Sequence, residues 1–153
     1  MKKVLFVCLG NICRSPMAEA IFNRLMQERN LSGQYESDSC GTGNYHIGDQ
    51  PDPRTIKACL SQGTPIRHAC RQATALDLEV FDVIFAMDAS NKYNLGKLAN
   101  AGQHAQKIFL MRDFDPEAPG TDVPDPYWGT DENFLEVYQI LERSLRHWLD
   151  KQA

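Results

Sequence analysis

The amino-acid sequence predicts a three-layer α/β fold in which helices cover both faces of a parallel sheet. Two short runs, VLFV and DVIFAM, are almost continuously apolar, which is typical of strands buried on both faces. Stretches with helical periodicity separate the strand-like runs, and such alternation builds parallel β-α-β units. Folds of this kind bind ligands outside the carboxyl ends of their strands. With 153 residues, we expect a single domain over 1–153.

The first half of the chain contains two expected strands and two expected helices. A strand at 4–7 leads to a helix that Ser15 would cap. Pro16 would then occupy the first helical position, where its missing N–H costs nothing. A second strand is expected at 35–40, and a second helix at 53–60 begins with a proline and ends before a glycine.

The second half continues the alternation. A buried strand is expected at 82–87, a helix with one internal glycine at 90–101, and a fourth strand at 107–111. The segment 113–129 contains four prolines and therefore cannot be regular structure. Thr130 then precedes a final amphipathic helix that carries acidic residues in its first turn.

Composition excludes several classes of function. The net charge is −4 and no cluster of basic residues is present, so we expect no nucleic-acid partner. No apolar run approaches the roughly 20 residues that a membrane helix needs, and the N-terminus does not resemble a signal peptide. We therefore expect a cytoplasmic protein that does not bind membranes.

The cysteines are expected to be reduced thiols, because their number is odd and no export signal is present. Their spacing does not match a zinc site either, so we expect no metal. The five are Cys8, Cys13, Cys40, Cys59 and Cys70.

The segment CLGNICRS joins the first strand to the first helix. A turn at a helix N-terminus exposes a row of backbone N–H groups that suits phosphate. Gly10 and Asn11 are residue types that readily adopt the left-handed conformation such a loop needs. Arg14 offers a planar fork for two phosphate oxygens, and Ser15 has a hydroxyl that could reach the sulfur of Cys8.

This set of residues suits nucleophilic displacement at phosphorus. The N–H groups, the helix dipole and the guanidinium would all stabilise a thiolate at Cys8, which would form a cysteinyl-phosphate. The expected phosphate-binding loop comprises Leu9, Gly10, Asn11, Ile12, Cys13, Arg14 and Ser15.

The segment VPDPYWG supplies an acid. Asp125 lies between two prolines that restrict its backbone to extended geometry, which can hold the carboxyl over a cleft. Such an acid would protonate an aryl leaving group. Tyr127 and Trp128 follow and could form walls for a flat aromatic substrate.

These motifs, CLGNICRSPMAEA and DPYWG, together with DSCGTGNYHIG and AMDASN between them, resemble the low-molecular-weight protein tyrosine phosphatase family. The resemblance covers essentially the whole chain. It implies a flavodoxin-like, doubly wound sheet of four parallel strands with the phosphate-binding loop after strand one. It also implies no metal or cofactor, phosphotyrosine-containing proteins as substrates, and phosphate or other oxyanions as inhibitors.

The resemblance also implies roles for individual residues. Cys8 would be the nucleophile, Arg14 the phosphate clamp, and Asp125 first the acid and then the base. Ser39 and His68 would support the loop by hydrogen bonds to Asn11. Three aromatic residues would line the substrate slot: Tyr45, Tyr127 and Trp128. A reversible disulfide between Cys8 and Cys13 would protect the nucleophile from over-oxidation.

Three other functions are compatible with a cysteine loop. An arsenate reductase needs two further relay cysteines close together between the second helix and the third strand, and that region offers only Cys59 and Cys70. A protein-arginine phosphatase tends to have threonine where this chain has Ile12, an apolar residue better suited to a phenyl ring. A phosphoryl carrier tends to lack an arginine clamp such as Arg14, and it would have no use for an acid such as Asp125.

Overall fold

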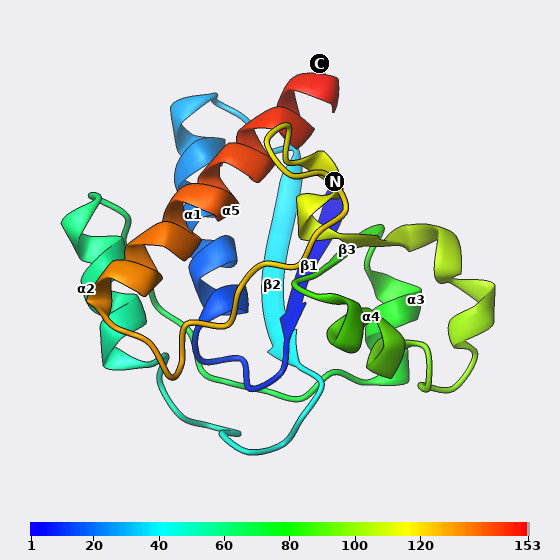
Figure 1. Ribbon diagram of the computed structural model, residues 1–153. Helices are drawn as coiled ribbons and strands as arrows, with labels where there is room; N and C mark the ends of the chain where they lie inside the picture. The colour runs from blue at the N-terminus through cyan, green and yellow to red at the C-terminus, as the bar shows by residue number, and fades with distance from the viewer. Residues whose placement is uncertain (153) are drawn as a thin grey trace.

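The computed structural model describes residues 1–152 and contains one sheet of four parallel strands (Figure 1). The strands are β1 (Lys2–Cys8), β2 (Tyr35–Gly41), β3 (Val83–Ala86) and β4 (Ile108–Leu110). Their order is β2-β1-β3-β4, so the chain moves to one side of β1 and later to the other. This is the doubly wound, flavodoxin-like order, and the predicted fold class is confirmed.

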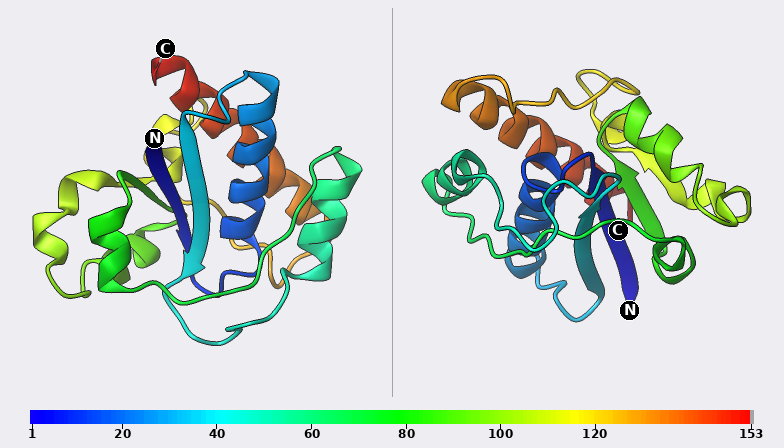
Figure 2. Two further views of the ribbon diagram at one scale, coloured as in Figure 1. Left: turned by 180° about the vertical axis from the view of Figure 1, so that it is seen from behind. Right: turned by 90° about the horizontal axis from the view of Figure 1, so that it is seen from below.

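The helices form the two outer layers. They are α1 (Arg14–Glu28), α2 (Pro53–Ser61), α3 (Ala75–Val80), α4 (Ala89–Leu95) and α5 (Asp131–Gln152), and the 3₁₀ turns are Ala101–Gln103, Ala105–Lys107 and Met111–Phe114. As Figure 2 shows, α1, α2 and α5 lie on one side of the sheet, and α3 and α4 lie on the other. None of the helices within residues 1–152 combines the length and apolarity needed to cross a membrane.

The alternation of side chains along β1 explains its continuous apolar run. Val4 and Phe6 belong to the core under α1 and α5, whereas Leu5 and Val7 belong to the core under α3 and α4. All four are fully buried. A strand covered on both faces has no solvent-facing position, so its sequence shows no polar alternation.

Three local predictions were wrong. Helix α1 begins at Arg14, and Cys13 occupies the N-cap without a side-chain hydrogen bond, so Ser15 does not cap the helix. Its hydroxyl instead points into the loop toward Cys8. Helix α3 was not predicted, because six residues are too few to show a helical period. Helix α4 ends at Leu95 rather than at 101.

Candidate active site

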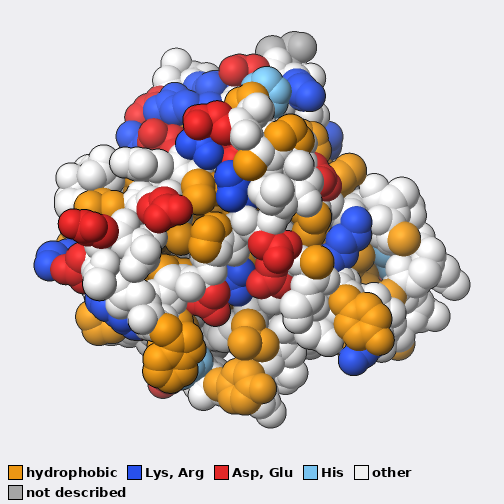
Figure 3. Space-filling view, in the orientation of Figure 1, with side chains coloured by type: hydrophobic (Ala, Val, Ile, Leu, Met, Phe, Trp, Pro, Cys, Tyr) orange, Lys and Arg blue, Asp and Glu red, His pale blue; other side chains and the backbone are white. Residues whose placement is uncertain are grey.

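Cys8 lies at the carboxyl end of β1, where the strand order reverses between β2 and β3. A cavity of about 340 Å³ opens at this edge of the sheet. Figure 3 shows hydrophobic side chains gathered at the lower edge of the molecule, over the ends of the strands. The cavity is lined by Cys8, Leu9, Gly10, Ile12, Cys13, Arg14, Tyr45, His46, Asp125, Tyr127 and Trp128.

The loop conformation depends on Asn11, which has a φ of 58°. Asparagine tolerates this left-handed conformation better than most residues. Gly10 does not adopt a positive φ, so that part of the prediction was wrong. Its absent side chain makes room for a neighbour instead, since a Cβ at Gly10 would lie 3.2 Å from Cδ2 of His46. Gly41 is needed for a similar reason, because a Cβ there would come within 2.6 Å of the Leu9 carbonyl oxygen.

The sulfur of Cys8 lies 3.0 Å from the hydroxyl oxygen of Ser15. Asn11 Nδ2 donates to the same hydroxyl oxygen at 2.8 Å, and the Ser15 hydrogen has two acceptors within reach, the Cys8 sulfur and the Cys40 carbonyl oxygen at 3.3 Å. Burial first, and then negative neighbours that include Asp52, raise the pKa of the Cys13 thiol to about 12. Within the loop, Cys13 is therefore held as a thiol.

Arg14 is almost fully buried, and its guanidinium is held by groups from two other segments. Nη1 donates to Asp88 Oδ2 at 2.8 Å and to the Val123 carbonyl oxygen at 2.9 Å. Nη2 lies 3.7 Å from Asp125 Oδ2. Although burial opposes the charged form, Cys8 and these carboxylates raise the pKa of Arg14 above its ordinary value. The fork is therefore charged and fixed in orientation.

Asp125 extends over the cavity from the proline-rich loop. Its side chain is 46% exposed, and Oδ1 accepts a hydrogen bond from the Tyr127 backbone N–H at 3.1 Å. The Tyr127 and Trp128 rings meet edge to face with centroids 4.9 Å apart, and Trp128 is 92% exposed. Trp128 and Tyr45, which is also largely exposed, stand at the rim of the cavity. A carboxyl group, a cation and a thiol thus face one cavity with aromatic walls.

Comparisons with known proteins identify the family of this chain. The model of the family described as low molecular weight phosphotyrosine protein phosphatase matches residues 3–153. The protein of that name from Homo sapiens is 42% identical over 151 residues, which is 98% of this chain and 95% of that protein. The chain belongs to the low molecular weight phosphotyrosine protein phosphatase family.

Two further relatives resemble the chain over most of its length. The low molecular weight phosphotyrosine protein phosphatase of Schizosaccharomyces pombe is 42% identical over 137 residues, covering 89% of this chain and 87% of its own. A crystal structure of a protein tyrosine phosphatase from Entamoeba histolytica, with Hepes in its active site, has a TM-score of 0.94 at 42% identity. That match covers 99% of this chain and 97% of the other.

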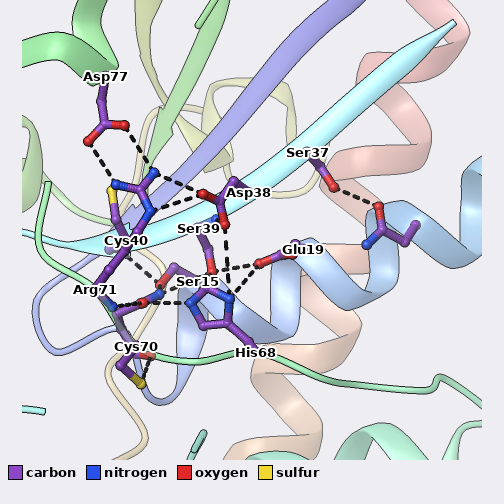
Figure 4. Close-up of polar contacts among 12 residues, drawn as sticks. Ser15, Glu19, Ser37, Asp38, Ser39, Cys40, His68, Cys70, Arg71 and Asp77 are labelled. Atoms are coloured by element: carbon purple, nitrogen blue, oxygen red, sulfur yellow. Dashed lines mark hydrogen bonds and ion pairs between the residues drawn. The ribbon is translucent and has the colours of Figure 1, made fainter. Parts of the chain in front are cut away.

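The phosphate-binding loop is supported from behind by a network of hydrogen bonds that includes Asn11. Figure 4 shows the side chains of Ser39, His68 and Arg71 that belong to it. Asn11 Nδ2 donates to Ser39 Oγ at 3.1 Å, and Asn11 Oδ1 accepts from the Arg71 backbone N–H at 3.0 Å. The ring of His68 places Nε2 2.7 Å from the same Oδ1. The structure therefore brings Ser39 and His68 to Asn11, where the resemblance places them.

The outer part of this network contains charged groups that the sequence analysis did not identify. His68 Nδ1 lies 3.3 Å from Glu19 Oε1, and Ser39 Oγ donates to that oxygen at 2.8 Å. Burial, together with the charge of Asp38, raises the pKa of Glu19 to about 7, and burial lowers the pKa of His68. Because Asn11 Oδ1 can only accept a hydrogen bond, His68 Nε2 must carry a hydrogen. One further proton, shared between His68 Nδ1 and Glu19 Oε1, satisfies the contact between those two atoms.

Within residues 1–152, one cluster has ligand atoms close enough together to hold a metal ion, and it consists of Glu19, Asp38 and His68. Arg71 Nε donates to Asp38 Oδ2 at 2.9 Å and so provides positive charge at this site. His68, the two carboxylates and Arg71 therefore form an ion-pair network.

Asp88 and Cys70 were also missed as members of the site. Asp88 directly follows β3, and the carboxyl end of a central strand is the sequence signal that could have identified it. Cys70 donates its thiol to the Asn11 carbonyl oxygen at 2.8 Å, and burial raises its pKa to about 11. From its sequence position, Cys70 is predicted only as a candidate relay cysteine.

Proposed function

We propose that this chain hydrolyses phosphotyrosine in proteins, and small aryl phosphates, through a cysteinyl-phosphate intermediate. The observation that carries the proposal is that Cys8, Arg14 and Asp125 converge on one cavity at the carboxyl end of β1. Membership of a phosphatase family supports the same reaction.

In the first step, the Cys8 thiolate attacks phosphorus opposite the phenolic oxygen. The S–P bond forms while the P–O ester bond breaks, and the protonated Asp125 gives its proton to the leaving oxygen. Arg14 and the loop N–H groups stabilise the charge on the equatorial oxygens. The Ser15 hydroxyl, 3.0 Å from the sulfur, stabilises the thiolate before attack and again when it leaves.

In the second step, the Asp125 carboxylate takes a proton from water. The water oxygen bonds to phosphorus, the S–P bond breaks, and inorganic phosphate is released with Cys8 regenerated as a thiolate. Because the product fits the same loop, phosphate and other tetrahedral oxyanions should inhibit competitively.

The walls of the cavity favour an aryl substrate. Tyr45, Tyr127 and Trp128 provide flat apolar surface, and Ile12 lines the cavity where an arginine phosphatase tends to have threonine. A relay for arsenate reduction has less support, because burial raises the pKa of Cys59 to about 12 and that of Cys70 to about 11. Neither would be a ready nucleophile at neutral pH.

Phosphotyrosine-containing proteins are the proposed partners, and the cytoplasm is the proposed location. A reducing compartment keeps the nucleophile available as a thiolate. Under oxidation, we propose that Cys8 forms a disulfide with Cys13, since both line the cavity. Thiol reductant would then restore the enzyme.

The proposal is tested with p-nitrophenyl phosphate at mildly acidic pH, without metal and with chelator. Wild type should turn over and Cys8→Ser should not, whereas Cys59→Ser, a buried cysteine of α2 outside the cavity, should retain activity. Phosphotyrosine and phosphoarginine peptides then separate the two phosphatase alternatives. An inactive wild type, or a long-lived phosphocysteine in it, would overturn the proposed hydrolysis.

A further inference from the structure

Arg54, in the first turn of α2, lies between the loop that carries the proposed acid and the phosphate-binding loop. Its guanidinium forms a two-point ion pair with Asp52, from Nε to Oδ1 at 3.1 Å and from Nη2 to Oδ2 at 3.0 Å. The remaining nitrogen, Nη1, donates to the Gly129 carbonyl oxygen at 3.3 Å. One side chain thus uses all three nitrogens to join two segments far apart in sequence.

The face of the same guanidinium contacts two aromatic rings. Its central carbon lies 5.5 Å from the ring centroid of Tyr127 and 4.5 Å from that of Phe134. Tyr127 is two residues from Asp125 and donates its backbone N–H to that carboxylate. Phe134 is fully buried in α5, so it provides a rigid support for the arginine. The cation is therefore held between the core and the acid loop.

Asp52 connects this arrangement to the phosphate-binding loop. Its backbone N–H donates to the Ile12 carbonyl oxygen at 2.8 Å, and its carboxylate also accepts from the Arg54 backbone N–H at 2.8 Å. Although partial burial opposes ionisation, the bonds from Arg54 lower the pKa of Asp52 below its ordinary value. The ion pair therefore persists at the mildly acidic pH at which the enzyme would be assayed.

The acid loop has a second attachment, on the other side of Asp125. The Val123 N–H donates to the Met87 carbonyl oxygen at 2.8 Å, and the Val123 carbonyl oxygen accepts from Arg14. Arg14 thus attaches the loop before the acid, and Arg54 attaches it after the acid. Two attachments on either side of a side chain restrict its position more than one attachment does.

We propose that Arg54 is a positioning residue for Asp125, an inference that rests on the proposed phosphatase function. Its contacts to Tyr127 and Gly129 set the distance from the acid to the phosphate-binding loop, through Asp52 and Ile12. Loss of these contacts leaves nucleophile and clamp in place and misplaces only the proton donor. The effect should therefore appear where protonation of the leaving group limits the rate.

The test measures kcat/KM for phenyl phosphate and p-nitrophenyl phosphate, together with the inhibition constant of inorganic phosphate. In Arg54→Met, we expect kcat/KM to fall about tenfold or more for phenyl phosphate and less than about threefold for p-nitrophenyl phosphate. The inhibition constant of phosphate should change less than about twofold, because the phosphate-binding loop keeps its own contacts. Arg54→Lys should show the same selective loss, since an ammonium lacks the planar fork.

Lys57→Met is the matched control. Lys57 is on the same helix and pairs with Asp131 Oδ2 at 2.6 Å, but it does not line the cavity. This variant should keep the wild-type kcat/KM for both phenyl phosphate and p-nitrophenyl phosphate. Equal losses on the two substrates, or weakened phosphate binding as large as the loss of rate, would overturn the role of Arg54. An inactive wild type would instead overturn the proposed function, and if Arg54→Met does not fold, Arg54→Lys decides the question.

Discussion

The Arg14→Lys variant keeps a positive charge in the phosphate-binding loop but removes the planar fork. In the structure, Nη1 is already committed to Asp88 at 2.8 Å and to the Val123 carbonyl oxygen at 2.9 Å. A single ammonium cannot keep both anchors and also contact two phosphate oxygens. Losing one preorganised donor to a transition-state oxyanion costs about 3–4 kcal/mol. We therefore expect kcat to fall by about 10²–10³.

The assay compares kcat and KM for p-nitrophenyl phosphate with the thermal midpoint of unfolding. Arg24→Lys, on the same helix, is the control, because Arg24 pairs with Glu28 at 3.0 Å and does not line the cavity. It should be nearly as active as wild type. Arg14→Lys with kcat within about fivefold of wild type would refute the assignment of the fork as a transition-state clamp, since that corresponds to only about 1 kcal/mol.

Three further variants test other parts of the structure. Asp125→Asn should lower kcat/KM for phenyl phosphate by about 10²-fold or more and for p-nitrophenyl phosphate much less, and similar losses on both would contradict its role as acid. Asp115, buried and bonded to Arg143 at 2.8 and 2.9 Å, has a pKa lowered to about 2 from 3.8, first by these bonds. Because its pKa is lowered in the folded state, ionised Asp115 stabilises the fold above about pH 4, and this stabilisation is lost as the pH falls toward 2. Asp115→Asn should therefore lower the free energy of unfolding in urea by about 2 kcal/mol at pH 7 and by less at pH 3. A pH-independent cost would contradict this reasoning. Cys13→Ser should be as active as wild type within about threefold but should not recover with thiol reductant after peroxide treatment, and full recovery would exclude the protective disulfide.

The phosphate-binding loop could be predicted because its parts are neighbours in sequence. Cys8, Asn11, Arg14 and Ser15 fall within eight residues of each other, and a strand followed by a helix leaves little choice about where they meet. Asp125 could be predicted as a candidate acid for a similar reason, since the prolines on either side restrict its backbone locally. Two of the local errors, the cap at Ser15 and the conformation of Gly10, arose because one residue type is compatible with several conformations and contacts. Which conformation and contact each residue adopts is decided by the packing of the loop.

The sequence by itself therefore determined the four strands, the longer helices and the residues of the loop after β1, because apolar periodicity and short motifs are local signals. Only the tertiary structure decided how the groups are coupled. Asp88 reaches Arg14 across 74 positions, and Arg54 reaches Gly129 across 75. A lone charged residue has no periodic or motif signal of its own, and its partner depends on how the strands are ordered and the helices packed. The positions of Arg14, of Asp125 and of the network around Asn11 follow from that packing.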